Sequence, residues 1–218
     1  MLFRSFANYD INEKYIFEYN TPMSEPHEKK VKNINPYLAE GNDIVIIKRK
    51  TSICECPKIS FGSMPNDGGF LLLSDKERND IIIKEPSITE FIKPLISAKE
   101  LLNNNKRWCF WLTDITPQEI RQSKEIQNRI ENVIKVREQS SRTATKKLAK
   151  FPSLFGEIRQ PDSNYIAIPL NTSENRKYIP LSFFTKNNIS NNSISVIHNA
   201  TLYHFGILTS LMHMTWIK

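Results

Sequence analysis

The stretch Arg107-Trp108-Cys109-Phe110-Trp111-Leu112 sets the expectation for the fold of this chain. Its aromatic and aliphatic residues are typical of a central β-strand. Thr116, Pro117 and Glu119 follow within a few residues, and they predict the start of a helix. Thr116 can cap the helix, Pro117 suits its first turn, and Glu119 completes a capping box. A buried strand that leads directly into a capped helix indicates an α+β fold.

The helical pattern that begins at Thr116 continues to about Lys150. Its apolar positions recur at helical spacing and predict one amphipathic face; they are Ile120, Ile126, Ile130, Val133 and Ile134. About 30 residues is long for a helix of a globular protein, and Ser140-Ser141 is the predicted break.

The second half of this helix is strongly basic. Six cations stand against one acid, Glu138, and Ser and Thr residues are interleaved with them. Cations and small hydroxyl groups together can hold phosphates by charge and by hydrogen bonds. We therefore predict that five residues bind phosphate: Lys135, Arg137, Arg142, Lys146 and Lys147. The alternative is an ordinary solvated helical face.

The remaining strands and helices are shorter. Composition and alternation predict strands at residues 14–19, 44–47, 70–73, 81–83, 165–168, 178–179 and 193–197. Helices are expected from the Ser74 cap to Asn79, in pieces over 89–102 with a break at Pro94, and over 201–218. Residues 60–69 and 184–192 read as loops. The expected architecture is a mixed sheet with a long basic helix, long loops and an apolar C-terminal helix.

Composition bounds the class of protein. The chain has 218 residues, 39% of them hydrophobic, and a formal net charge of +7. It can therefore bury a core, and its charge favours a polyanionic partner, with nucleic acid first. Three cysteines (Cys54, Cys56 and Cys109) provide no disulfide framework and suit a reducing compartment. No segment has the ~20 apolar residues that span a membrane. We expect a cytoplasmic protein with no membrane partner.

The sequence carries no recognisable catalytic motif. The one Gly-Gly pair, Gly68-Gly69, lacks the strand and helix that frame a nucleotide-binding turn. Asp162, Glu174 and Arg176 only loosely imitate the carboxylates and lysine of a metal-dependent nuclease. The four histidines have no metal-ligand spacing, and we interpret them as structural. We predict no catalytic residue, no metal ligand and no cofactor within this chain.

Several polar residues suit the recognition of base edges. Arg159 and Gln160 belong to the types that bind guanine and adenine in the major groove. The other candidates lie in two polar loops, and they are Ser173, Arg176, Lys177, Asn188 and Asn191. The alternatives are a strand entry with a salt bridge for Arg159, and loops that contact only water.

Seven runs of residues, in this order along the chain, resemble a known family. They are 25–28, 31–38, 61–69, 106–112, 154–161, 178–180 and 199–214, with sequences that include Phe61-Gly62-Ser63-Met64-Pro65-Asn66-Asp67-Gly68-Gly69 and Leu154-Phe155-Gly156-Glu157-Ile158-Arg159-Gln160-Pro161. They resemble the target-recognition domain of MmeI-type restriction–modification enzymes. The resemblance covers residues 15–218, and residues 1–14 are expected to be an N-terminal extension or an expression remnant.

The resemblance implies a function. In this family, such a domain grips double-stranded DNA and selects the site. A methyltransferase domain of the same parent chain transfers a methyl group from S-adenosylmethionine to the exocyclic amine of adenine, and a helical C-terminal part follows. We therefore expect a DNA-binding fragment whose loops face DNA, with double-stranded DNA and those other parts of the parent chain as partners. Whether the parent also cleaves DNA stays open.

Two other functions remain as alternatives. One is a stand-alone metal-dependent nuclease with an unrecognised site. The other is a protein-docking module, whose apolar final helix packs on the rest of a larger enzyme; a contiguous apolar patch near residues 201–218 would support it. The hypothesis of DNA recognition expects Arg142, Lys146, Arg159 and Arg176 to line one face.

Overall fold

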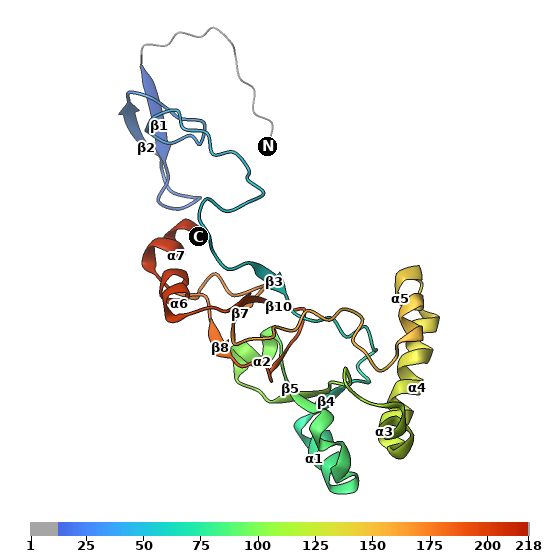
Figure 1. Cartoon of the computed structure of the whole chain (residues 1–218). Coiled ribbons are helices and arrows are strands. Elements are labelled where there is room, and N and C mark those ends of the chain that lie inside the picture. Colours follow the sequence, from blue (N-terminus) through green and yellow to red (C-terminus); the bar gives the residue numbers. More distant parts are fainter. Residues whose placement is uncertain (1–12, 218) are drawn as a thin grey trace. The chain divides into compact units, whose positions relative to one another are not determined.

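The computed structural model describes residues 13–217 and divides the chain into two compact units between Glu55 and Cys56. Unit 1 is the N-terminal part, and unit 2 holds the remaining 163 residues, Cys56–Lys218. Figure 1 shows their elements. The expected extension over residues 1–14 lies almost wholly outside the described residues. The sequence pattern did not predict a division at Glu55.

Unit 1 is built on an antiparallel hairpin. Strand β1 (Lys14–Glu18) pairs with β2 (His27–Val31), so the strand predicted at 14–19 is confirmed. The strand predicted at 44–47 is wrong: residues 42–49 form no regular structure, and the four apolar side chains are 63–72% exposed. A β-branched run becomes a strand only when a partner strand pairs with it, and none does among the described residues of this unit.

Unit 2 contains two four-stranded sheets. The first is antiparallel, in the order β3-β10-β7-β8, and consists of β3 (Ile59–Phe61), β10 (Ile194–His198), β7 (Tyr165–Pro169) and β8 (Ser182–Phe184). The second is mixed, in the order β4-β6-β5-β9, and consists of β4 (Leu72–Ser74), β6 (Arg107–Phe110), β5 (Ile92–Ile96) and β9 (Ile189–Ser190), with β5 and β9 parallel. The predictions of an α+β fold, a mixed sheet and an inner strand at Arg107 are confirmed.

The helices surround these sheets. They are α1 (Asp75–Lys84), the 3-10 helix η1 (Pro86–Phe91), α2 (Ala98–Asn103), α3 (Pro117–Gln122), α4 (Lys124–Gln139), α5 (Thr143–Lys147), the 3-10 helix η2 (Leu148–Lys150), α6 (Leu202–Leu208) and α7 (Leu211–Ile217). The caps predicted at Ser74 and Thr116 are present, each as a complete capping box. The long helix breaks at Ser140, as predicted, and also at Ser123, whose hydroxyl caps α4.

Two apolar clusters hold unit 2 together. The larger one joins β4, β5 and β6 to α4, and it includes Leu71, Leu95, Phe110, Ile126 and Val133, all 1% exposed or less. The smaller one lies on the antiparallel sheet around Tyr165 and Val196. Isolated bridges from Ser63 to Asn191 and from Met64 to Glu157 connect the chain between the sheets. The loop 62–66 and the segment that follows η2 are therefore fixed against each other.

Four predictions of local structure in unit 2 are wrong. Residues 81–83 continue α1 instead of forming a strand, and residues 92–96 form β5, a strand that contains Pro94. Residues 178–179 belong to a loop. The expected surface loop 184–192 contains the buried strand β9.

The expected C-terminal helix is present as two shorter helices, α6 and α7. They leave apolar side chains in solvent, with Leu202 78%, Met212 85% and Trp216 77% exposed. Among the described residues, no helix combines the length and apolar character that crossing a membrane requires.

Candidate nucleic-acid interface

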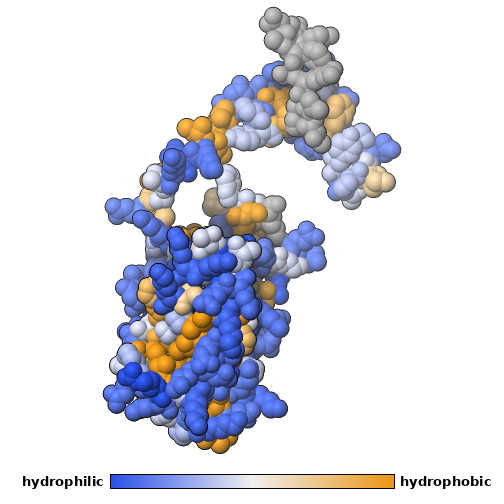
Figure 2. Space-filling view, turned by 90° about the vertical axis from the view of Figure 1, so that its right-hand side faces the viewer, coloured by the Kyte–Doolittle hydropathy of each residue, from blue (hydrophilic) through white to orange (hydrophobic). Residues whose placement is uncertain are grey.

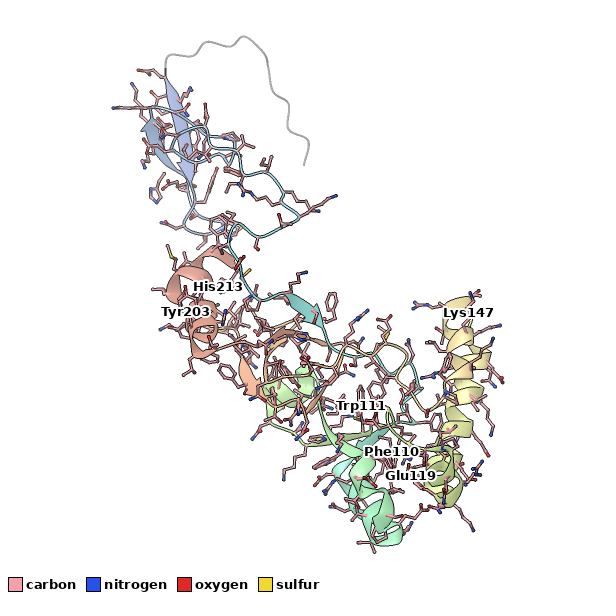
Figure 3. All side chains as sticks on the ribbon, viewed as in Figure 1. Phe110, Trp111, Glu119, Lys147, Tyr203 and His213 are labelled. Atoms are coloured by element: carbon pink, nitrogen blue, oxygen red, sulfur yellow. The ribbon has the colours of Figure 1, made fainter. Side chains whose placement is uncertain are left out.

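The basic segment, residues 142–150, begins where α4 ends. Arg142, Lys146, Lys147 and Lys150 are exposed in it, as is Lys135 on α4. Among the described residues, none of these five cations takes part in a salt bridge. Figure 3 shows Lys147 at the free end of α5, at one extremity of unit 2. These cations are therefore available to an anionic ligand.

Figure 2 views unit 2 from the side of α3, α4 and α5. This face is mostly hydrophilic, and an oblique band of hydrophobic residues crosses it. A hydrophilic surface that carries the exposed cations of the basic segment suits a polyanion more than an apolar partner.

Arg137, the fifth predicted phosphate ligand, has a different role. It is fully buried, and its guanidinium donates to five main-chain carbonyls, those of Pro65, Asn66, Leu148, Phe151 and Leu154, at 2.7–3.1 Å. A guanidinium has five N–H donors, so none is left for a phosphate. The structure contradicts the expected contact. Arg137 instead fixes η2 and the turn after it against the loop 62–66.

Burial lowers the pKa of Arg137, and the nearby carboxylate of Asp67 opposes that change. Asp67 is itself 3% exposed and accepts hydrogen bonds from the backbone N–H groups of Gly69 and Leu71, at 3.0 and 2.6 Å. Gly68 and Gly69 both have positive φ angles, of 67° and 91°, which explains the glycine pair in this turn. The pair shapes a tight loop rather than a nucleotide site.

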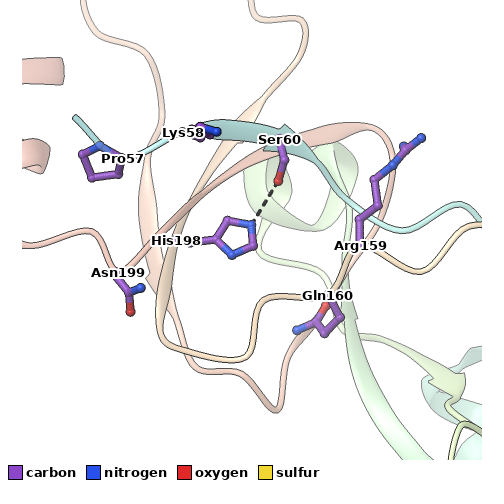
Figure 4. Close-up of a pocket in the computed structure, with 7 residues that line it drawn as sticks. All are labelled: Pro57, Lys58, Ser60, Arg159, Gln160, His198 and Asn199. Carbon is purple, nitrogen blue, oxygen red and sulfur yellow. Dashed lines mark hydrogen bonds between the residues drawn. The ribbon is translucent and has the colours of Figure 1, made fainter. Parts of the chain in front are cut away.

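A cleft of about 690 Å³ lies beside the end of β10. It is lined by Pro57 and by six polar residues: Lys58, Ser60, Arg159, Gln160, His198 and Asn199. Figure 4 shows the imidazole of His198 pointing at Ser60, and their Nε2 and Oγ atoms are 3.0 Å apart. No acidic residue lines this cleft, so its surface favours an anion.

Arg159 lies at the rim of the cleft. Its guanidinium forms an ion pair with Glu157, and both side chains are about 40% exposed. Its backbone N–H donates to the hydroxyl of the buried Ser63, at 3.0 Å. The backbone is thus held in place while the guanidinium keeps one side in solvent. Arg159 remains a candidate for reading a base.

Gln160, in contrast, uses its whole carboxamide inside the protein. The amide nitrogen donates to the carbonyls of Lys186 and Asn188, and the amide oxygen accepts from the N–H and hydroxyl of Ser190. In this arrangement no bidentate pair with adenine can form. Gln160 is a structural residue here, and we leave it out of the proposed base contacts.

The two asparagines predicted to read bases are also engaged. The side-chain oxygen of Asn188 accepts from the N–H and hydroxyl of Thr185, at 3.3 and 2.9 Å. That of Asn191 accepts from the N–H of Ser193, at 3.1 Å. Their amide NH₂ groups make no hydrogen bond among the described residues. Each asparagine keeps a donor, and neither keeps the free donor–acceptor pair that adenine requires.

The loop 171–177 lies away from the basic segment. Ser173 and Arg176 line a pocket of about 400 Å³ together with Met214 and Ile217 of α7. The ammonium of Lys177 lies 5.3 Å from the ring centre of Tyr178. In Figure 1, α7 and α5 stand at opposite ends of unit 2. The structure therefore separates these three residues from Arg142 and Lys146, with the cleft between the two groups.

Sequence reasoning missed four residues of the cleft: Lys58, Ser60, His198 and Asn199. They come from two segments more than 130 residues apart, and the pairing of β3 with β10 brings these segments together. No local motif marks them. Among the described residues, no group of three potential metal ligands is present.

Comparison with known proteins identifies the family. Residues 40–218 match the family described as "MmeI, target recognition domain". The chain is 39% identical over 205 residues to DNA methyltransferase A of Bacillus subtilis (strain 168). The alignment covers 94% of this chain and 23% of that protein. It thus spans about a quarter of the length of this relative.

A solved structure is similar as well. The type IIL restriction-modification enzyme MmeI, determined in complex with DNA, superimposes with a TM-score of 0.80 and 39% sequence identity, over 95% of this chain and 28% of MmeI. The family match, the sequence identity and the structural likeness agree with the resemblance drawn from the sequence runs. The chain belongs to the MmeI target recognition domain family.

Proposed function

We propose that this chain recognises a short sequence in double-stranded DNA for an adenine-specific DNA methyltransferase of a restriction–modification system. The observation that carries the proposal is the likeness to MmeI, whose structure was solved with DNA, at a TM-score of 0.80 and 39% identity. The net charge of +7 and the unpaired cations of the basic segment support it.

The proposed mechanism divides the work between two kinds of residue. Arg142, Lys146, Lys147 and Lys135 hold phosphates and displace counterions, which gives affinity without sequence preference. Arg159 and the exposed loop residues Ser173, Arg176 and Lys177 read base edges. A good bidentate contact discriminates against the wrong base by about 1–3 kcal/mol. Since α5 and α7 stand at opposite ends of unit 2 and the loop 171–177 lies beside α7, the two groups would contact different parts of the duplex.

The chemistry would be supplied by other parts of the parent chain. We propose that a methyltransferase domain binds S-adenosylmethionine and methylates an adenine that is flipped out of the stack. This part of the proposal rests on the relationship to DNA methyltransferase A, of which the chain covers 23%. No residue of the candidate interface is assigned a catalytic role.

The test is DNA binding by the 218-residue chain, measured by fluorescence anisotropy. Sequencing of methylated adenines in the source genome first supplies the site. We expect tighter binding to a duplex with that site than to a scrambled duplex, and a decrease in affinity with salt. Equal affinity for both duplexes would overturn sequence recognition. Cleavage of either duplex with Mg²⁺ would favour the nuclease instead.

A second proposal concerns the apolar face of α6 and α7, formed by Leu202, Tyr203, Ile207, Leu211, Met212 and Trp216, which are 46–85% exposed. Ile207, Leu211, Met212 and Trp216 also line a pocket of about 800 Å³. A continuous apolar patch of this kind marks an interaction surface. We propose that it contacts another part of the parent chain, since the relatives are about four times longer.

The contact can be tested in the full-length parent protein. Met212→Glu with Trp216→Glu is expected to loosen the docked domain, so that limited proteolysis releases a fragment that contains this chain. Lys76→Glu with Lys84→Glu, on α1, is the control pair. Equal protease resistance of both pairs and the parent would contradict the contact.

A further inference from the structure

We propose that the cleft beside the end of β10 binds one phosphodiester group of the DNA backbone, with Lys58, Ser60 and Asn199 as its ligands. The inference rests on the proposed function and adds to it a phosphate site outside the basic segment. It assigns a role to residues that no sequence motif indicated.

The first argument is that the cleft offers unpaired hydrogen-bond donors. Among the described residues, neither the ammonium of Lys58 nor the amide of Asn199 makes a hydrogen bond or an ion pair, and both residues are exposed. A Lys ammonium has three donors and an Asn amide has two. Since no acidic side chain lines the cleft, no carboxylate there would repel an anion.

The second argument is the pairing of Ser60 with His198. The Ser60 hydroxyl can either donate to Nε2 of His198 or accept from it, depending on the tautomer, at 3.0 Å. When Nε2 carries the hydrogen, the hydroxyl accepts that hydrogen and its own proton is free to donate to a phosphate oxygen. In that tautomer His198 holds the Ser60 oxygen in place without using its donor.

The third argument is that a rigid frame carries these groups. Ser60 is paired with Val196, and Ile59 with Ile197, in the antiparallel ladder of β3 and β10. Asn199 directly follows β10 with a φ angle of 53°, in the left-handed region. A backbone that is already in place before the anion arrives lowers the entropy that binding costs. A preformed site suits a backbone contact, which sets the register of the protein on DNA.

A phosphate bound in the cleft would lie close to a candidate base-reading residue. Arg159, the remaining candidate for base reading near β3, lines the same cleft, and its guanidinium extends away from His198 in Figure 4. A phosphate held by Lys58 would fix the position of the duplex beside Arg159. We infer that the cleft binds a phosphate, whereas Arg159 at its rim contacts a base.

The test uses two variants, each with a matched control. Lys58→Gln removes a charge, and Lys76→Gln removes one from the exposed start of α1. Asn199→Gly removes an amide at a positive φ, and Asn104→Gly does the same at the end of α2, where φ is 54°. Glycine adopts this conformation at no steric cost, so both backbones stay intact. Circular dichroism checks the fold of each variant.

We expect Lys58→Gln to weaken binding several-fold to every duplex, with or without the site, and to reduce the slope of log K against log salt by about 0.9. Asn199→Gly should weaken binding without changing that slope. Both controls should bind like the parent chain. Duplex phosphates can be replaced one at a time by neutral methylphosphonates. At one position the replacement should weaken binding of the parent chain but should not further weaken binding of Lys58→Gln.

Three outcomes would overturn the inference while the proposed function stands. They are an unchanged salt slope in Lys58→Gln, the absence of any methylphosphonate position coupled to Lys58, and a loss confined to the cognate site, which would indicate base reading. Failure of the parent chain to bind any duplex would overturn the proposed function itself.

Discussion

The carboxamide oxygen of Gln160 accepts two hydrogen bonds from Ser190, from its backbone N–H at 2.8 Å and from its hydroxyl at 3.1 Å. Ser190 is fully buried in β9, and Tyr165 adds a hydrogen bond to the carbonyl of Asn188, at 2.7 Å. The segment that leads into β9 is therefore held by the half-buried Gln160 and the buried Tyr165. It is a fixed part of the mixed sheet, and Gln160 is one of the residues that keep it there.

Replacing Gln160 should cost stability rather than sequence specificity. Gln160→Ala leaves the N–H and hydroxyl of Ser190 without their acceptor, and we expect the free energy of unfolding to fall by about 1–3 kcal/mol. Urea denaturation followed by circular dichroism measures this change. Gln122→Ala, at an exposed position of α3, is the control and should change stability little. Equal stability of the two variants would contradict the role assigned to Gln160.

Arg137→Lys tests whether geometry or charge matters at this buried position. Lysine keeps the charge but has three donors, so it cannot satisfy five carbonyls. We expect a loss of about 3 kcal/mol or more in the free energy of unfolding, because buried carbonyls lose their partner. Thermal unfolding measures it, with Arg121→Lys at an exposed position as the control. A melting temperature equal to that of the control would show that the guanidinium is dispensable.

The basic segment should contribute affinity without sequence preference. Arg142→Ala combined with Lys146→Ala removes two exposed cations, so binding to all duplexes should weaken. If each cation contacts one phosphate, the slope of log K against log salt should decrease by about 1.8. Lys76→Ala with Lys84→Ala changes the net charge equally on α1 and serves as the control. If both pairs bind DNA alike, only the overall charge matters and the basic segment is not a contact surface.

Arg159→Ala should relax one base position in the methylation pattern of the full-length protein. The reason is that a guanidinium partly free of Glu157 can contact the edge of one guanine, and its loss removes about 1–3 kcal/mol of discrimination. Sequencing of methylated sites after expression of the variant measures the change. Arg78→Ala, distant on α1, is the comparison. An identical pattern in both would mean that Arg159 only balances Glu157.

The cap of α1 should give stability a dependence on pH. Hydrogen bonds from the Ser74 hydroxyl and then from the Ser74 backbone N–H lower the pKa of Glu77 below its ordinary value of 4.5. A carboxylate with a lowered pKa in the folded state stabilises above that ordinary value and loses its contribution as the pH falls through the folded pKa. Glu77→Gln should therefore lower the melting temperature at pH 6 and have less effect at pH 3. An equal decrease at both values would contradict this origin.

Local signals in the sequence predicted the helix starts well. The Ser74 and Thr116 caps depend on residues three positions apart, so their geometry is fully encoded in a short stretch. The inner strand at Arg107 was also predicted from local sequence, because its aromatic residues favour a β-strand. Such features need no information about distant parts of the chain.

Strands that depend on distant partners were not predictable in this way. Ile189 and Ser190 look like part of a polar loop, but they pair with Leu95 and Ile96 of β5. Pro94 appeared to end a helix. It fits β5 because β9 reaches only Leu95 and Ile96, so no strand needs a donor from Pro94 on that side. The prediction of a strand at 44–47 failed for the opposite reason, since no partner strand pairs with it within residues 13–217.

The candidate site shows the same limit at the level of side chains. Arg and Gln are the residue types that read DNA, and the sequence alone cannot tell a free guanidinium from a buried one. Arg142 and Arg159 keep exposed surface, whereas Arg137 has none. Lys58 and Asn199 lie in a cleft that exists only after β3 pairs with β10. Burial and strand pairing, which are tertiary properties, decide these roles.

The guanidinium of Arg137 donates only to main-chain oxygens, and this bears on which residues around it can be substituted. Carbonyl groups are common to all amino acids, so the hydrogen bonds from Arg137 do not depend on which side chains stand at 148–154, as long as the path of the polypeptide is kept. If residues 148–154 were replaced by the corresponding segment of another family member with the same backbone path, Arg137 would keep its hydrogen bonds. The fold can thus change what its surface offers to a ligand while one arginine continues to hold the scaffold underneath.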